Sequence, residues 1–132
     1  WRNRQGSKGE VMHPPIFKVC SSSPAVTAIL GASPLRMYQF GLAPQLVVKP
    51  YATWQTISGS PENYLWGRPD ADGFTLQVDI FSATAAEARD AAKAIRDAIE
   101  LSAYVVRWGG ESVDPDTKTY RVSFDIDWIV QR

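Results

Sequence analysis

Hydrophobic and polar residues alternate with a period of two in the two clearest stretches of the chain, residues 75–81 and 119–130. This period is typical of a strand with one covered and one open face. Residues 51–58 are rich in Tyr, Thr, Trp and Ile, which favour strands, and shorter strands are predicted at 35–40 and 103–108. The pattern therefore predicts a sheet of four to five strands.

Two other stretches have the period of a helix. After Thr84, an alanine-rich stripe faces one way and charged residues face the other, and Thr84 and Glu87 have the spacing of a capping box. Residues 14–31 predict a helix broken at three serines, with Ser23 as the N-cap of the second part. We predict an α+β fold: a mixed, mainly antiparallel sheet with two helices packed on one face.

Three segments are predicted to be loops. In residues 41–49, the run 46–48 (LVV) is expected to lie against the body of the domain. Residues 59–73 contain three Gly and two Pro, which favour a projecting arm without secondary structure. Residues 109–117 contain Gly-Gly and Asp-Pro, which are turn signals.

Length and charge limit the organisation and the partners. The chain has 132 residues and predicts one domain over residues 12–132, preceded by a polar extension, native or left by expression, over residues 1–11. The 14 basic and 14 acidic residues balance, and residues 12–132 carry 11 basic against 13 acidic, a net charge of −2. This balance argues against a general nucleic-acid binder. Since no apolar run approaches about 18 residues, we expect no membrane partner and folding in the cytosol.

Candidate chemistry is sparse. The one cysteine, Cys20, lies on the apolar stripe of the first helix and is expected to be structural, and the one histidine is His13. Asp79, Asp125 and Asp127 lie on the polar faces of two strands. Such carboxylates either bind a divalent cation, act as an acid/base pair, or form a lumen- or subunit-facing polar surface with Arg121 as partner. We favour the polar surface and expect no catalytic residue, metal or cofactor.

The segment 59–73 also carries a candidate interface, made of Tyr64, Leu65, Trp66 and Arg68. Aromatic residues beside an arginine are typical of interface anchors. Two alternatives stay open for Trp66: it anchors a partner, or it folds back on its own domain.

The chain as a whole resembles the phage tail-completion family, the tail-terminator and head-to-tail joining proteins of long-tailed bacteriophages. The resemblance extends over residues 14–130. It rests on residues 26–31 (VTAILG), 36–38 (RMY), 49–54 (KPYATW), 57–59 (ISG), 76–81 (LQVDIF) and 84–89 (TAAEAR).

This resemblance implies a structural protein without catalysis. Its copies would form a ring, typically a homohexamer, at the head-proximal end of the virion tail. The ring would cap the tail tube, contact the tube protein and the head-completion or connector protein, and let genome DNA pass without specific binding. Synthesis would take place in the host bacterial cytoplasm. The alternative is a small α+β ligand-binding or enzymatic domain, which a closed pocket with convergent polar groups would indicate.

Overall fold

The computed structural model describes residues 13–62 and 71–131 and contains one five-stranded sheet in the order β1-β2-β3-β5-β4. β1 is parallel to β2, and the other pairs are antiparallel. The predicted α+β class with a mixed, mainly antiparallel sheet is thus confirmed. The strands are β1 Met37–Gln39, β2 Tyr51–Pro61, β3 Ala71–Ser82, β4 Ala103–Val113 and β5 Tyr120–Gln131.

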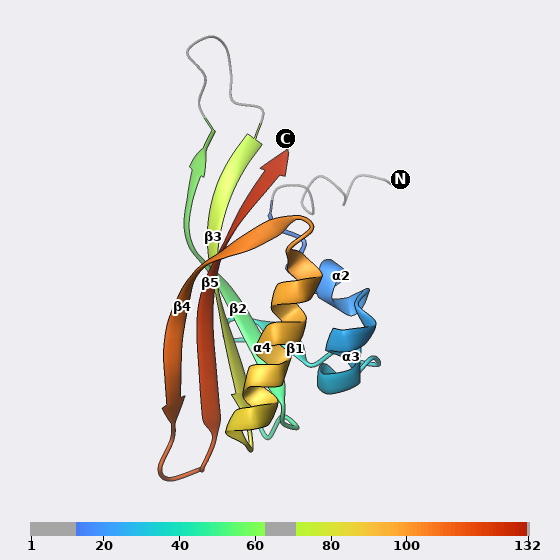
Figure 1. Cartoon of the computed structure of the whole chain (residues 1–132), viewed down its shortest axis with the longest axis vertical. Helices are drawn as coiled ribbons and strands as arrows, with labels where there is room; N and C mark the ends of the chain where they lie inside the picture. The colour runs from blue at the N-terminus through green and yellow to red at the C-terminus, as the bar shows by residue number, and fades with distance from the viewer. Residues whose placement is uncertain (1–12, 63–70, 132) are drawn as a thin grey trace.

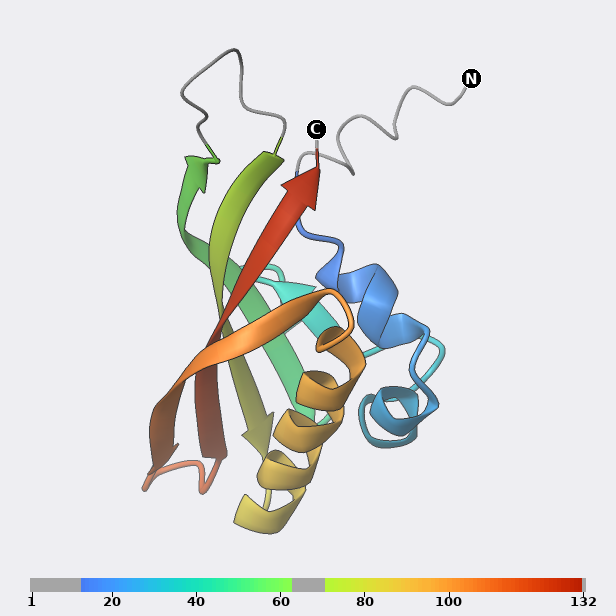
Figure 2. The ribbon, with the colours of Figure 1, turned by 45° about the horizontal axis from the view of Figure 1, so that its top comes forward.

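The helices cover one face of the sheet and leave the other face open (Figures 1 and 2). The first predicted helix is divided into α2 (Ile16–Ser21) and α3 (Pro24–Leu30), and the long helix is α4 (Ala85–Ile99). The break falls at the serines as predicted, because the Ser23 hydroxyl accepts a hydrogen bond from the Val26 N–H at 3.4 Å and starts a new helix.

The start of α4 differs in part from the predicted capping box. The Thr84 hydroxyl accepts from the Glu87 N–H at 3.2 Å, as expected. The Glu87 carboxylate does not return to the Thr84 N–H but accepts from the hydroxyl of the fully buried Ser82 at 2.7 Å. The Thr84 N–H donates to that same hydroxyl at 3.3 Å. The Ser82 hydroxyl therefore forms hydrogen bonds with both the Glu87 carboxylate and the Thr84 N–H, and so joins the end of β3 to the helix.

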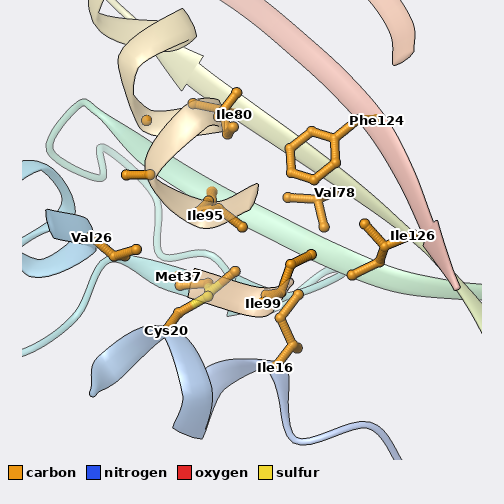
Figure 3. Close-up of a cluster of buried hydrophobic side chains, with 14 of the residues drawn as sticks. Ile16, Cys20, Val26, Met37, Val78, Ile80, Ile95, Ile99, Phe124 and Ile126 are labelled. Atoms are coloured by element: carbon orange, nitrogen blue, oxygen red, sulfur yellow. The ribbon is translucent and has the colours of Figure 1, made fainter. Parts of the chain in front are cut away.

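The core lies between α4 and the covered face of the sheet (Figure 3). Ile95 and Ile99 of α4 are fully buried, as are Val78 of β3 and Phe124 and Ile126 of β5. The small residues of the α4 stripe are buried too, so the helix lies close to the strands. α2 and α3 pack on the side of α4, and Cys20 of α2 closes that edge of the core.

The prediction of an unstructured arm over residues 59–73 is wrong at both ends. β2 continues to Pro61 and β3 begins at Ala71. Gly59 pairs with Phe74, and a Cβ at Gly59 would lie 2.9 Å from the Phe74 ring, so this glycine makes room for an aromatic neighbour. β1 pairs with β2 only as far as Trp54, so Pro61 lies at a free edge, where a strand tolerates proline.

The predicted loop 109–117 is also partly wrong. β4 runs on to Val113, and its register shifts between Trp108 and Gly110. Gly110 has φ +114°, a value that glycine adopts readily and that suits a bulge. The Gly-Gly pair therefore bends a strand that continues. The turn itself follows, where the Asp114 carboxylate accepts from the N–H of Asp116 at 2.9 Å.

The loop 41–49 is found where predicted, but its apolar run lies against the body only in part. Leu46 is fully exposed and Val48 is 65% exposed, whereas Val47 between them is half-buried. Leu46 has φ 57°, a left-handed backbone conformation. The expectation that the run 46–48 as a whole lies against the body is therefore wrong for Leu46 and Val48.

Candidate functional site

The open face of the sheet gathers the polar residues that the sequence singles out. The register places Gln77 opposite Asp125, and Asp79 opposite Ser123, on β3 and β5. Since side chains alternate along a strand, these residues point away from the helix-covered core. The two strands that carry Asp79, Asp125 and Asp127 are therefore neighbours in the sheet.

Asp79 and Arg121 form the first ion pair on this face. The Arg121 guanidinium donates from Nη2 and Nε to Asp79 Oδ1 at 2.8 and 3.1 Å. Gln77 Nε2 donates to the same carboxylate at 3.3 Å. Asp79 is only 9% exposed although no helix covers it, because the long side chains of its neighbours shield it.

Asp125 and Asp127 each have a separate partner. Arg107 of β4 donates to Asp125 Oδ2 at 3.1 Å, and the Thr75 hydroxyl donates to Asp127 Oδ1 at 2.7 Å. Sequence reasoning missed Arg107, because two bulges shift the register of β4 and the strand lacks regular alternation. The three predicted carboxylates therefore share a face, but each binds a different donor.

This arrangement favours the polar-surface interpretation of Asp79, Asp125 and Asp127. A shared proton requires two carboxylates in contact, whereas here the hydrogen bonds lead to Arg121, Arg107 and Thr75. Within residues 13–62 and 71–131, no group of three or more His, Cys, Asp or Glu side chains is placed to hold a metal ion.

An aromatic row, missed from the sequence, lies at one end of the open face. Tyr51 of β2 stacks on Phe81 of β3 with ring centroids 4.9 Å apart, and Tyr38 of β1 meets Tyr51 edge-on at 6.4 Å. Arg121 is the register partner of Phe81, so this row leads directly into the Asp79–Arg121 pair. The open face is thus aromatic at one end and ionic in the middle.

Cys20 and His13 do not form a reactive pair. Cys20 is completely buried, and burial raises the pKa of its thiol to about 12. The thiol therefore stays protonated near neutral pH and is a poor nucleophile. The ring of His13 lies instead near Phe74, with centroids 5.8 Å apart. The structural role predicted for Cys20 agrees with this placement.

The predicted interface residues Tyr64, Leu65, Trp66 and Arg68 lie outside the described residues. The strands on either side are described, and β2 and β3 continue past the helical layer towards this segment (Figure 1). Among the described helices, none is long and apolar enough to cross a membrane.

Comparison with known proteins gives a family and a fold. Residues 14–131 match the family model described as tail completion protein gp17. A chain in the virion of a native gene transfer agent particle is similar in structure, with a TM-score of 0.68 and 13% sequence identity over 89% of this chain and 92% of that chain. No curated protein matches the sequence. At this identity the structural match supports the fold, and the family model covers nearly the whole described domain. The chain therefore belongs to the tail completion protein gp17 family, structural proteins of the bacteriophage tail.

Proposed function

We propose that this protein is a tail terminator: its copies close into a ring, a hexamer as the family resemblance implies, at the head-proximal end of the tail. The ring caps the tail tube and joins it to the head connector. The observation that carries this proposal is the match of residues 14–131 to the tail-completion family. A chain of similar fold occurs in the virion of a native gene transfer agent particle, which is consistent with a virion component.

We further propose that the open face of the sheet lines the channel of this ring. It carries three carboxylates, on Asp79, Asp125 and Asp127, against two guanidinium groups, on Arg107 and Arg121. The two arginines are already paired with carboxylates, so few cations are left to hold DNA phosphates. A mildly acidic, internally paired surface lets DNA slide past without binding tightly.

The segment with Tyr64, Leu65, Trp66 and Arg68 is proposed as a contact with a neighbouring copy, the tube or the head connector. Its ends continue from the paired strands β2 and β3. Trp66→Ala is expected to leave the melting temperature of the isolated chain nearly unchanged and to weaken ring closure or tail joining, because an interface aromatic contributes about 2 kcal/mol or more. Unfolding of the isolated variant would contradict this role.

No catalysis is part of the proposed function. Asp125→Asn is expected to alter stability or assembly only, since the Asp125 carboxylate is used in a structural pair with Arg107. A specific turnover that disappears in an Asp125→Asn protein able to assemble would overturn this part of the proposal.

Electron microscopy of tails made with and without this protein tests the proposed function. The expected result is a ring of the protein at the head-proximal end and, in its absence, tails that fail to join heads. Complementation with the intact chain restores joined particles. Tails that lack such a ring and still join heads normally would refute the proposal, whatever the state of the isolated protein in solution.

A further inference from the structure

Exposed apolar side chains gather in two segments of the described chain. Of the twelve large hydrophobic residues that are exposed there, eight lie in the loop 40–48 or in β4. The loop contributes Phe40, Leu42, Leu46 and Val48, and β4 contributes Tyr104, Val106, Trp108 and Val113. Along β4 these side chains lie on both sides of the edge: Tyr104 is opposite Asp127 on the open face, and Trp108 is opposite Phe124 on the helix-covered face. Clusters of this kind on a small domain mark surfaces that a partner covers.

The two segments start from opposite edges of the sheet. β1 and β4 are the outermost strands in the order β1-β2-β3-β5-β4. The loop 40–48 leaves β1 and returns to β2, where the Lys49 ammonium donates to the Thr119 hydroxyl next to the turn between β4 and β5. One chain therefore carries two different sets of exposed apolar side chains. Contacts between unlike surfaces of identical copies build a ring when the rotation closes.

The loop 40–48 is built to present apolar groups. It contains no charged residue. Leu46 at its tip is fully exposed, and its φ of 57° is a left-handed conformation that non-glycine residues rarely adopt. Because it is fully exposed, this leucine contributes no packing within its own subunit.

β4 offers a matching surface. It pairs only with β5 among the described strands, and Trp108 is held against Phe124 with ring centroids 5.1 Å apart while remaining 52% exposed. Register shifts on both sides of Arg107 and Trp108 interrupt the backbone pattern of the free edge. Because such bulges impede the addition of a further strand, the contact rests on side chains.

The charges along β4 are already paired within the subunit. Arg107 binds Asp125 at 3.1 Å, and Arg89 of α4 binds Glu111 at 2.7 Å. An uncharged segment can therefore cover this strand without leaving a charge unpaired. The loop 40–48 is such an uncharged segment.

We propose that the loop 40–48 of one copy docks on β4 of the next copy. This contact rests on the proposed ring and supplies its subunit interface. A second copy covers both apolar surfaces in a single type of contact, repeated around the ring. With edges facing neighbours, the open face of the sheet is free to line the channel and the helices lie outside.

Cysteine cross-linking of the full chain tests the contact. The variant Gln45→Cys with Val106→Cys places one thiol in the loop and one on β4. The native Cys20 is completely buried and does not react with the cross-linker. A short bifunctional maleimide is expected to give a ladder of dimers and higher multimers, because each copy links to two neighbours. Single-cysteine variants stop at dimers. In a control pair, Ser21→Cys with Val106→Cys, one thiol lies at an exposed position of α2 and not in the loop. This pair is expected to give no such ladder.

Two exposed leucines provide a matched comparison in the Gln45→Cys, Val106→Cys background. Leu46→Asp is expected to abolish the ladder, whereas Leu101→Asp, at a 95% exposed site outside both segments, leaves it intact. Circular dichroism should show both variants folded, since neither leucine is part of the core.

The outcomes separate this contact from the proposed function. Absence of a ladder from the loop and β4 pair overturns the contact, since cross-linking traps even weak association. If rings are nevertheless seen on tails, the proposed function stands with a different interface. A ladder without rings on tails supports the contact and refutes the terminator role.

Discussion

On the covered face of the sheet, Val130 is 9% exposed, and on the open face Asp79 is exposed to the same extent. The valine is shielded by apolar packing beneath the helices, which excludes water and needs no partner. The aspartate is shielded by polar neighbours, and the Arg121 guanidinium compensates its charge. Equal burial on the two faces therefore rests on different interactions. We expect the removal of one side chain to lower the free energy of unfolding by different amounts on the two faces.

The largest effect is expected on the covered face. Phe124→Ala removes a fully buried ring between β5 and α4 and leaves a cavity, so it is expected to lower the free energy of unfolding by about 3–5 kcal/mol. Chemical denaturation monitored by tryptophan fluorescence measures this loss. Phe124→Leu, which keeps most of the volume, should restore a large part of it. A loss below about 1 kcal/mol for the alanine variant would mean that this face is not tightly packed.

A smaller effect is expected from the open face. Arg121→Ala leaves the shielded Asp79 carboxylate without its cation, and we expect a loss of about 1–2 kcal/mol, reduced by the partial exposure of the arginine. Arg96→Ala is the matched control, because its partner Asp97 is half-exposed, and should cost about 0–1 kcal/mol. Equal losses in the two variants would contradict the special role of the open-face pair.

The hydroxyl partner of Asp127 tests the same face without removing a cation. Thr75→Val keeps the shape of the side chain but removes the donor at 2.7 Å. The expected loss is about 1 kcal/mol, measured by thermal unfolding. The double variant Thr75→Val, Asp127→Asn should lose less than the sum of the two single variants, because the interaction is then already absent. Strict additivity would show that the pair is not coupled.

The smallest effect concerns Cys20 at the edge of the covered core. Its thiol has a pKa of about 12 in the folded protein against 9.0 for an ordinary cysteine. Stability from this group is therefore complete below pH 9 and is lost as the pH rises from 9 towards 12. Between pH 8 and 9.5, the wild type should lose up to about 1 kcal/mol more than Cys20→Ala, which cannot titrate. Parallel pH profiles of the two proteins would show that the thiol is accessible to water.

Much of the fold follows from local patterns in the sequence. The alternation in β3 and β5 and the helical period of α4 determine which residues face the core, because burying those apolar positions requires these conformations. The break between α2 and α3 was likewise readable from Ser23 and Pro24, since capping acts over only a few residues.

Predictions from the sequence were wrong where the role of a residue depends on a neighbour that is distant in the chain. Gly59 resembled a turn signal but makes room for Phe74, and Gly110 resembled a loop but forms a bulge against β5. Leu46 and Val48 were expected to lie against the body of the domain but are exposed. Composition alone cannot distinguish these cases, because the distinction lies in contacts between segments far apart in the chain.

The sequence by itself determined the middle of the long strands, the helices, the core-facing positions and the presence of aspartates on polar strand faces. Only the tertiary structure decided that Asp79 pairs with Arg121 and Asp125 with Arg107, because strand register and the bulges of β4 set those distances. It also decided that β1, from which the loop 40–48 departs, and β4 lie at opposite edges, since strand order is a property of the whole sheet. Local periodicity fixes which way a side chain points, whereas pairing between distant strands fixes what it meets.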